Sequence, residues 1–247
     1  MITRALRKYK KSALLSILMA GTVAVAAFPG IGEGASQTIT AVYVPGATAL
    51  DPADPAWNVA PVVTLAGKHI DYVDTGCGSN KVSEYEKRDL RVRAVHNGTD
   101  IFFRFEWDDP SADTVVNDPD LFADAVALEI PFREGGNTDV KMGTQNTPVN
   151  IIMWRADLPR PQNATGGGIG TVQTSPDPES QNIERSQNWS NGVWTVIVSR
   201  PMVAASDNQV TFRRGDSRRI AFGNWEGSDW ERDGHKNIYR WQDLYIQ

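Results

Sequence analysis

The stretch LRVRAVHNGTDIFFRFEW, residues 90–107, holds the strongest short-range signal for secondary structure in the sequence. Before the Asn97-Gly98 dipeptide, apolar residues alternate with arginines; after it, apolar residues alternate with Arg104 and Glu106. This alternation has the two-residue period of a strand with one buried face, and Asn-Gly is a preferred hairpin turn. The stretch therefore predicts an antiparallel β-hairpin.

Five further segments have strand-like apolar patterns, with turn-forming residues between them. They span residues 124–132, 149–156, 192–200, 208–214 and 218–227. Between them, no segment keeps a helical period over ten residues. Many short strands joined by loops that contain Gly, Pro, Asn and Asp are typical of a β-sandwich. We therefore expect an all-β chain, folded as a β-sandwich with long loops.

The N-terminus has the pattern of a secretory signal peptide. Five basic residues lie within residues 1–12, an uncharged apolar stretch follows, and small residues end the segment at position 36. The apolar run is shorter than the roughly 18 residues expected of a membrane-spanning helix, and an uncleaved anchor is the alternative interpretation. We predict a signal peptide at 1–36, one domain at 37–247, and a periplasmic protein with no membrane attachment after cleavage.

Charge and cysteine content exclude several classes of function. Without residues 1–36 the chain has 20 basic and 29 acidic residues, a formal charge of −9. This charge argues against binding to nucleic acid or anionic membranes, which need a basic patch. Cys77 is the only cysteine and no C-x-x-C-H motif is present. Covalent c-type haem, cysteine-ligated Fe–S clusters and cysteine-rich zinc sites are therefore excluded.

The sequence has no recognisable hydrolytic centre. Its three histidines, His69, His96 and His235, lie outside the common nucleophile and metalloprotease motifs. The acidic run EWDDP at 106–110 follows a predicted strand and fits ordinary turn chemistry. A glycosidase-type pair of carboxylates stays open as a hypothesis, but no pattern singles one out.

The polar stretch at 157–190 is too long for an ordinary connection between strands. Loops of this length are usually functional, interfacial or disordered. Its GGGIG run at 166–170 lacks the Lys-Ser/Thr and the helix of a phosphate-binding loop. We therefore expect a loop that is committed to an interface, and no nucleotide site.

Two positions are hard to explain by packing alone. Met142 lies in the polar loop DVKMGTQNTPVN at 139–150, where no core gap calls for methionine. Near the C-terminus, five Trp and Tyr residues surround Gly-His-Lys at 234–236. Aromatic residues at this density either line a flat apolar pocket or form a sandwich core. His235 and Lys236 are either charges at a loop tip or candidate metal ligands.

These segments together resemble a known family. FADAVALEIPF, KMGTQNTPVNIIMWRAD and FGNWEGSDWERDGHKNIYRWQDL are similar to the haem b (gamma) subunit of the type II dimethyl sulfoxide reductase group. That group includes ethylbenzene and dimethylsulfide dehydrogenases, chlorate and selenate reductases and nitrite oxidoreductases. LDPADPAWNVAPVVTL at 50–65 agrees with the same family, so the resemblance spans nearly all of the chain after residue 36.

The resemblance implies a β-sandwich that holds one non-covalent haem b per chain. By position in the family motifs, the axial ligands of the iron would be Met142 and Lys236. The chain reads Lys-Met-Gly where the family pattern is Gly-Met-Gly. His235 is a rival nitrogen ligand. Met153 is a weaker rival for the sulfur ligand, since its place within a predicted strand suggests a core residue.

The resemblance also implies a subunit that transfers electrons and has no catalytic residues of its own. Its haem would relay electrons between an Fe–S (beta) subunit, fed by a molybdenum catalytic (alpha) subunit, and a soluble c-type cytochrome or similar carrier. The alternative hypothesis is a carbohydrate- or ligand-binding β-sandwich module without haem, because related sandwiches serve that purpose and a fold does not fix a function.

Overall fold

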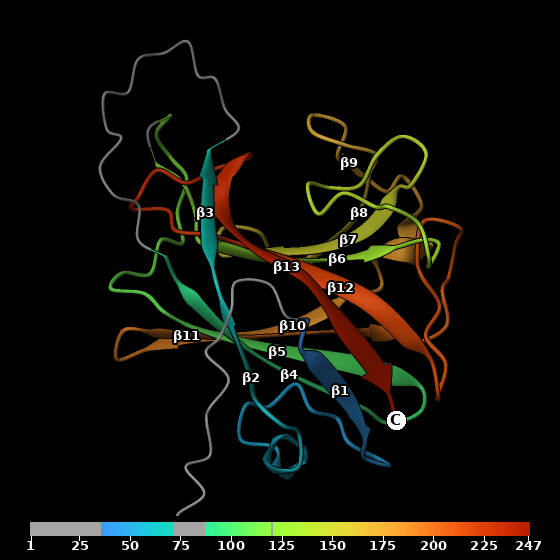
Figure 1. The fold of residues 1–247 in the computed structure, drawn as a ribbon. Coiled ribbons are helices and arrows are strands. Elements are labelled where there is room, and N and C mark those ends of the chain that lie inside the picture. The colour runs from blue at the N-terminus through green and yellow to red at the C-terminus, as the bar shows by residue number, and fades with distance from the viewer. Residues whose placement is uncertain (1–35, 72–86, 120) are drawn as a thin grey trace, which may run out of the picture. The chain divides into compact units, whose positions relative to one another are not determined.

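The computed structural model describes residues 36–71, 87–119 and 121–247, and these residues form one mixed sheet of 13 strands (Figure 1). The predicted signal peptide and Cys77 lie outside the described residues. The order in the sheet is β10-β11-β5-β4-β1-β13-β12-β6-β7-β8-β9, with β2 paired to β4 and β3 paired to β13. Strand β1 runs parallel to both β4 and β13, and the other pairs are antiparallel.

The elements have the following bounds. The strands are β1 (Thr38–Tyr43), β2 (Val63–Ala66), β3 (Lys68–Asp71), β4 (Asp89–His96), β5 (Asp100–Asp108), β6 (Ala125–Pro131), β7 (Val149–Arg155), β8 (Gln162–Gly166), β9 (Gln173–Thr174), β10 (Glu184–Ser190), β11 (Val193–Pro201), β12 (Ser217–Trp225) and β13 (His235–Ile246). Two 3-10 helices, η1 (Pro55–Asn58) and η2 (Pro178–Gln181), accompany them. Neither of these described helices has the length and apolar character needed to span a membrane.

The hairpin predicted from residues 90–107 is confirmed as the pair β4 and β5. Val92 lies opposite Phe105, and Ala94 lies opposite Phe103, so the apolar positions of both strands share one face. At the turn, the Asn97 side-chain oxygen accepts hydrogen bonds from the backbone N–H groups of Thr99 and of Asp100, the first residue of β5. The period of the sequence thus fixes the strand register here.

The sheet curls so that two of its halves pack face to face (Figure 1). Strands β10, β11, β5 and β4 form one layer, and β12, β6, β7 and β8 form the other. Phe105 on β5 meets Phe222 on β12 with ring centroids 5.8 Å apart. Trp107 on β5 meets Trp154 on β7 at 6.1 Å. The main apolar core lies between these layers, as expected for the predicted β-sandwich.

The second layer is apolar on its outer side as well. All seven residues of β6 are buried, so its inward positions and its outward positions are both covered. The outward residues belong to a second apolar cluster, which we call the outer cluster: Ala125, Ala127, Val149, Ile151, Ala164 and Trp225. Antiparallel sheets usually present a polar outer face to water. Here the outer face is apolar and buried, with Met142, Met153 and Trp241 packed against the outer cluster.

Two predictions from the sequence are wrong in the structure. Residues 157–190 are not one long loop, because they contain β8, β9, η2 and β10. Polar residues dominate β10, which lies at the edge of the sheet and shows no alternation of apolar residues. Residues 208–214 do not form a strand: the N–H of Val210 donates to the Asn150 side chain and that of Phe212 to the Met202 carbonyl, so neither enters a ladder.

Candidate functional site

Met142 projects from a turn that packs on the outer cluster. Its φ is +67°, which is uncommon for a residue other than glycine and is found where surrounding structure enforces it. The N–H of Gly143 donates to the Asp139 carbonyl, and the N–H of Gly168 donates to the Met142 carbonyl, both at 2.9 Å. Gly143 itself has φ +73°, and a Cβ there would lie 2.7 Å from the Thr147 carbonyl oxygen. The backbone therefore requires glycine at 143, whereas Met142 holds a conformation that methionine rarely adopts.

Lys236 lies near the start of β13 and is 7% exposed. Its Nζ is 4.5 Å from the centroid of the Trp225 ring, which belongs to the outer cluster. Burial lowers the pKa of Lys236 from 10.5 to about 8, while the charges of Glu129 and Asp233 act in the opposite direction. The buried amine therefore gives up its proton more readily than a surface lysine does.

Glu129 connects the two predicted ligands. It lies on β6 facing outward and is 7% exposed. Burial raises the pKa of Glu129 to about 8; the charge of Lys236 and a hydrogen bond from the Met142 backbone N–H work against this rise. Its Oε1 accepts no hydrogen bond from the described residues. The Glu129 side chain thus interacts with both Lys236 and the Met142 turn, so these two lie on the same face of the layer.

His235, the rival nitrogen ligand, faces the other way. Neighbouring residues of a strand point to opposite faces of the sheet. The His235 ring packs edge-on against the His69 ring with centroids 4.8 Å apart, whereas the Lys236 amine lies against Trp225. The structure therefore brings Lys236, and not His235, to the outer face that carries Met142.

Met153, the rival sulfur ligand, differs from its expected place in the core. It is half-buried and packs against the outer cluster, and not between the layers. Its neighbour Trp154 fills the interior instead, since it is fully buried in the main core. Met153 thus shares the outer face with Met142, but it projects from the regular strand β7 and not from a strained turn.

The aromatic residues near the C-terminus divide among three environments. Trp225 and the half-buried Trp241 lie on the outer face. Tyr239 is 1% exposed and belongs to the main core. Trp230 and Tyr245 are 42% and 41% exposed. Both interpretations of this stretch therefore hold in part, because it contributes to the core and to the candidate site.

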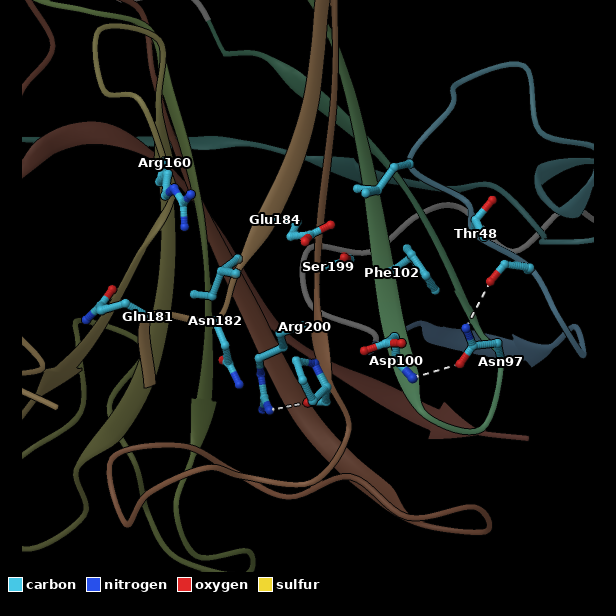
Figure 2. Close-up of a pocket in the computed structure, with 14 residues that line it drawn as sticks. Thr48, Asn97, Asp100, Phe102, Arg160, Gln181, Asn182, Glu184, Ser199 and Arg200 are labelled. Atoms are coloured by element: carbon cyan, nitrogen blue, oxygen red, sulfur yellow. Dashed lines mark hydrogen bonds between the residues drawn. The ribbon is translucent and has the colours of Figure 1, made fainter. Parts of the chain in front are cut away.

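A separate pocket of about 410 Å³ lies beside β5 and β11 (Figure 2). None of its lining residues belongs to the outer face. Most of the lining residues are polar, and they include Arg160, Gln181, Asn182 and Glu184, which are labelled in Figure 2. Phe102 is its one aromatic lining residue, and its side chain is buried at 4% exposure. This pocket therefore presents no open aromatic ring on which a sugar could stack.

Comparison with known proteins decides the family. A family model described as ethylbenzene dehydrogenase matches residues 54–171 and 161–237, which include both Met142 and Lys236. The chain belongs to this family. The resemblance that was drawn from the sequence motifs is thereby confirmed at the level of the ethylbenzene dehydrogenase family.

Curated relatives of this ethylbenzene dehydrogenase family member are named as subunits of oxidoreductases. The chlorate reductase subunit gamma of Ideonella dechloratans is 31% identical over 91% of this chain and 90% of its own length. The dimethylsulfide dehydrogenase subunit gamma of Rhodovulum sulfidophilum is 29% identical over 82% and 78%. A Haloferax mediterranei protein named "Putative respiratory nitrate reductase heme subunit" is 29% identical over 77% of this chain, which spans 66% of that relative.

Solved structures of similar fold support the all-β sandwich. A Bacteroides uniformis protein described as a "putative carbohydrate-binding protein" has a TM-score of 0.55 at 13% identity, covering 86% of this chain and 100% of its own. A carbohydrate binding module of family 9 from Caldicellulosiruptor kristjanssonii has a TM-score of 0.50 at 8% identity, covering 85% and 96%. At these identities the likeness confirms the fold of this ethylbenzene dehydrogenase family member and says nothing about its ligand.

Some features of the site were missed from the sequence although a signal was present. Glu129 is the only charged residue in the otherwise apolar strand AVALEIP, and an acid in such a strand has to find a specific environment. Asp109, Asp124 and Glu226 lie at strand ends, where acidic residues are common in turns. Only the folded chain brings those three together in the interior.

Proposed function

We propose that this chain is an electron-transfer subunit that holds one non-covalent haem b, with Met142 and Lys236 as the axial ligands. One observation carries the proposal: a thioether and a buried amine, far apart in the sequence, lie on one apolar sheet face and share Glu129 and Trp225 as neighbours. The curated relative named as a heme subunit supports the same cofactor.

The residues on this face fit a haem. Small side chains of β6 and β8, Ala125, Ala127 and Ala164, are buried in the same apolar cluster as Trp225. Cofactor sites are usually lined by apolar side chains with a few well-placed polar groups. The polar groups here are the Lys236 amine and the Glu129 carboxyl, whose Oε1 accepts no hydrogen bond from the described residues.

The donor set also defines the chemistry. Met142 offers a neutral, soft sulfur, which suits ferrous haem and raises its reduction potential. Lys236 binds iron only as the free amine, and burial has already reduced the cost of losing the proton. When bound, the haem supplies a one-electron redox centre. With Met142 and Lys236 both holding the iron, no position would be open to substrate, so the subunit would carry electrons without catalysing the substrate reaction.

The names of two relatives support a place for this chain in a larger assembly. Two of them are named gamma subunits of chlorate reductase and dimethylsulfide dehydrogenase, which supports a multi-subunit oxidoreductase. In this assembly the chain relays electrons between an Fe–S subunit, fed by a molybdenum catalytic subunit, and a soluble c-type cytochrome or similar carrier. The basic and apolar N-terminus supports export to the periplasm by a signal peptide that ends near residue 36.

The proposal is tested by the pigment of the protein itself. The chain produced in a haem-replete host should contain one haem per polypeptide, with the pyridine haemochrome spectrum of haem b. Acidic acetone should extract the haem, since Cys77 alone cannot form the usual pair of thioether bonds. A colourless protein from its native complex would contradict the proposal and favour the ligand-binding module without haem.

A further inference from the structure

Three buried carboxylates, none of them a proposed haem ligand, meet where strands of the two layers begin or end. Asp109 follows β5, Asp124 precedes β6 and Glu226 follows β12, so the group joins strand ends from both layers. Their exposures are 1%, 0% and 2%. One oxygen from each lies within 4.8 Å of the other two. Burying three carboxylates so close together needs a positive partner or bound protons.

Neutral donors hold these carboxylates in place. Asp109 accepts hydrogen bonds from the backbone N–H of Ser111 and from the Trp107 indole. Asp124 accepts three, from the N–H groups of Asp113 and Gly227 and from the Trp194 indole. These bonds orient the oxygens and bring no formal charge to the cluster.

No basic side chain in the described part of the chain forms an ion pair with any of the three. Arg88 is the cation whose charge reaches Glu226, but its ion pairs are with Asp229 and Glu231. Burial raises the pKa of Asp109 to about 8 and that of Asp124 to about 7, and it raises the pKa of Glu226 as well. The described basic side chains therefore do not neutralise the cluster, so bound protons or a bound cation must do so.

Glu226 supplies a second observation that points to a ligand. Its Oε1 accepts hydrogen bonds from the N–H and the hydroxyl of Ser228. Its Oε2 is buried and has no hydrogen-bond partner among the described residues. The Glu226 carboxyl interacts with that of Asp109, and a proton on Asp109 would form a hydrogen bond between them. The two facing carboxyls therefore hold either a shared proton or, when both are ionised, a cation.

We propose that Asp109, Asp124 and Glu226 bind one Ca²⁺ ion that ties the two layers of the sandwich together. Ca²⁺ takes oxygen ligands at about 2.3–2.6 Å, and three oxygens that all lie within 4.8 Å of one another can reach one such ion together. Zn²⁺ prefers nitrogen and sulfur ligands, and Mg²⁺ usually keeps several waters, which a closed site does not favour.

The ion would also support the outer face, although the proposal does not depend on haem. Glu226 directly follows Trp225, whose ring packs against the Lys236 amine. Gly227 donates its N–H to Asp124, and a Cβ at this glycine would lie 2.7 Å from the Asp113 side chain. A cation on Asp109, Asp124 and Glu226 thus fixes the segment that carries Trp225.

The test uses the full chain and Ca²⁺ alone as the probe. The protein is stripped with EGTA, exchanged into metal-free buffer and followed by thermal unfolding during a CaCl₂ titration, with MgCl₂ in parallel. We expect the melting temperature to rise with Ca²⁺ until one ion is bound per chain, and elemental analysis of untreated protein to find that ion. Glu226→Gln keeps the shape of the side chain and should weaken Ca²⁺ binding by about tenfold or more, since affinity depends on ligand charge.

Glu184→Gln is the matched control, because it removes an exposed carboxylate outside the cluster and should leave the titration unchanged. If Glu226→Gln does not fold, Asp109→Asn takes its place, and the EGTA comparison on the unaltered chain needs no variant. Equal melting temperatures with Ca²⁺ and with EGTA would overturn the proposal. So would a Glu226→Gln protein that is more stable than the unaltered chain in both conditions, because a shared proton would then hold the cluster together. Stabilisation by Mg²⁺ alone would overturn the assignment to calcium.

Discussion

Gly166→Ala should weaken haem binding, although neither glycine nor alanine has a side-chain atom that can bind iron. Gly166 ends β8, directly beside the Met142 turn. A Cβ at this position would lie 2.8 Å from the Met142 carbonyl oxygen and 3.2 Å from the Met142 Cβ. An ordinary contact begins near 3.4 Å, so the turn must move by about 0.6 Å (3.4 − 2.8). The substitution therefore displaces the sulfur ligand while it leaves the donor set intact.

The size of the effect follows from the cost of overpacking, about 1–3 kcal/mol. Without haem, the turn can shift and relieve the contact with the new Cβ. Binding of Met142 to the iron would require the original position of the turn, so the overpacking energy weakens haem binding. At 1.4 kcal/mol per tenfold, the dissociation constant should rise by about 5- to 140-fold. The assay is a titration of haem-depleted protein, followed by the absorbance of the bound haem.

Gly167→Ala is the matched control. Its Cβ would meet only ordinary contacts, the closest being the Thr171 hydroxyl at 3.6 Å. We expect its haem affinity to stay within about twofold of that of the unaltered chain, since the added methyl group would displace no neighbouring atom. If Gly166→Ala binds haem as tightly as Gly167→Ala and keeps a low-spin spectrum, the position of the Met142 turn does not control ligation.

Two further predictions concern the scaffold. Leu128 is 1% exposed and lies between the layers, so Leu128→Ala should lower the free energy of unfolding, measured in urea, by about 2–5 kcal/mol. Val203 is 69% exposed, so the control Val203→Ala should lower it by less than about 0.5 kcal/mol. Equal losses in the two variants would contradict the assigned core. Burial and the charge of Arg214 lower the pKa of His96 below its ordinary 6.5, against a hydrogen bond to the Gln247 carbonyl. The unfolded chain therefore binds this proton first, so the free energy of unfolding should decrease as pH falls below 6.5, and His96→Gln should reduce that pH dependence.

The strands that pack between the layers were predictable, because local alternation encodes their buried face. The hairpin at 90–107 carries this alternation, whereas β6 and β7 were predictable as short, mostly apolar runs between turn-forming residues. β10 could not be predicted in this way, since an edge strand with polar residues on both faces has no period to detect. Val210 and Phe212 are a case where alternation misled the prediction. Both are apolar and buried at alternate positions, but their backbone N–H groups donate to the Asn150 side chain and the Met202 carbonyl and not to a neighbouring strand.

The candidate site was predictable only in part. Family motifs pointed to Met142 and to the Gly-His-Lys tripeptide, but a shift of one residue in a strand exchanges its two faces. Packing of His235 on His69 and of Lys236 on Trp225 supplies the missing information. The cluster of carboxylates could not be inferred, since its members come from strand ends in different layers.

The most direct test of the ligand assignment is the absorption spectrum of Lys236→Ala beside that of His235→Ala, each purified with haem. We expect Lys236→Ala to lose the low-spin spectrum, because the iron loses its nitrogen ligand, and His235→Ala to keep it, because His235 lies on the opposite face against His69. Met142→Ala should also lose the low-spin state, whereas Met153→Ala should retain it. A low-spin Lys236→Ala protein together with a high-spin His235→Ala protein would contradict Lys236 as the ligand.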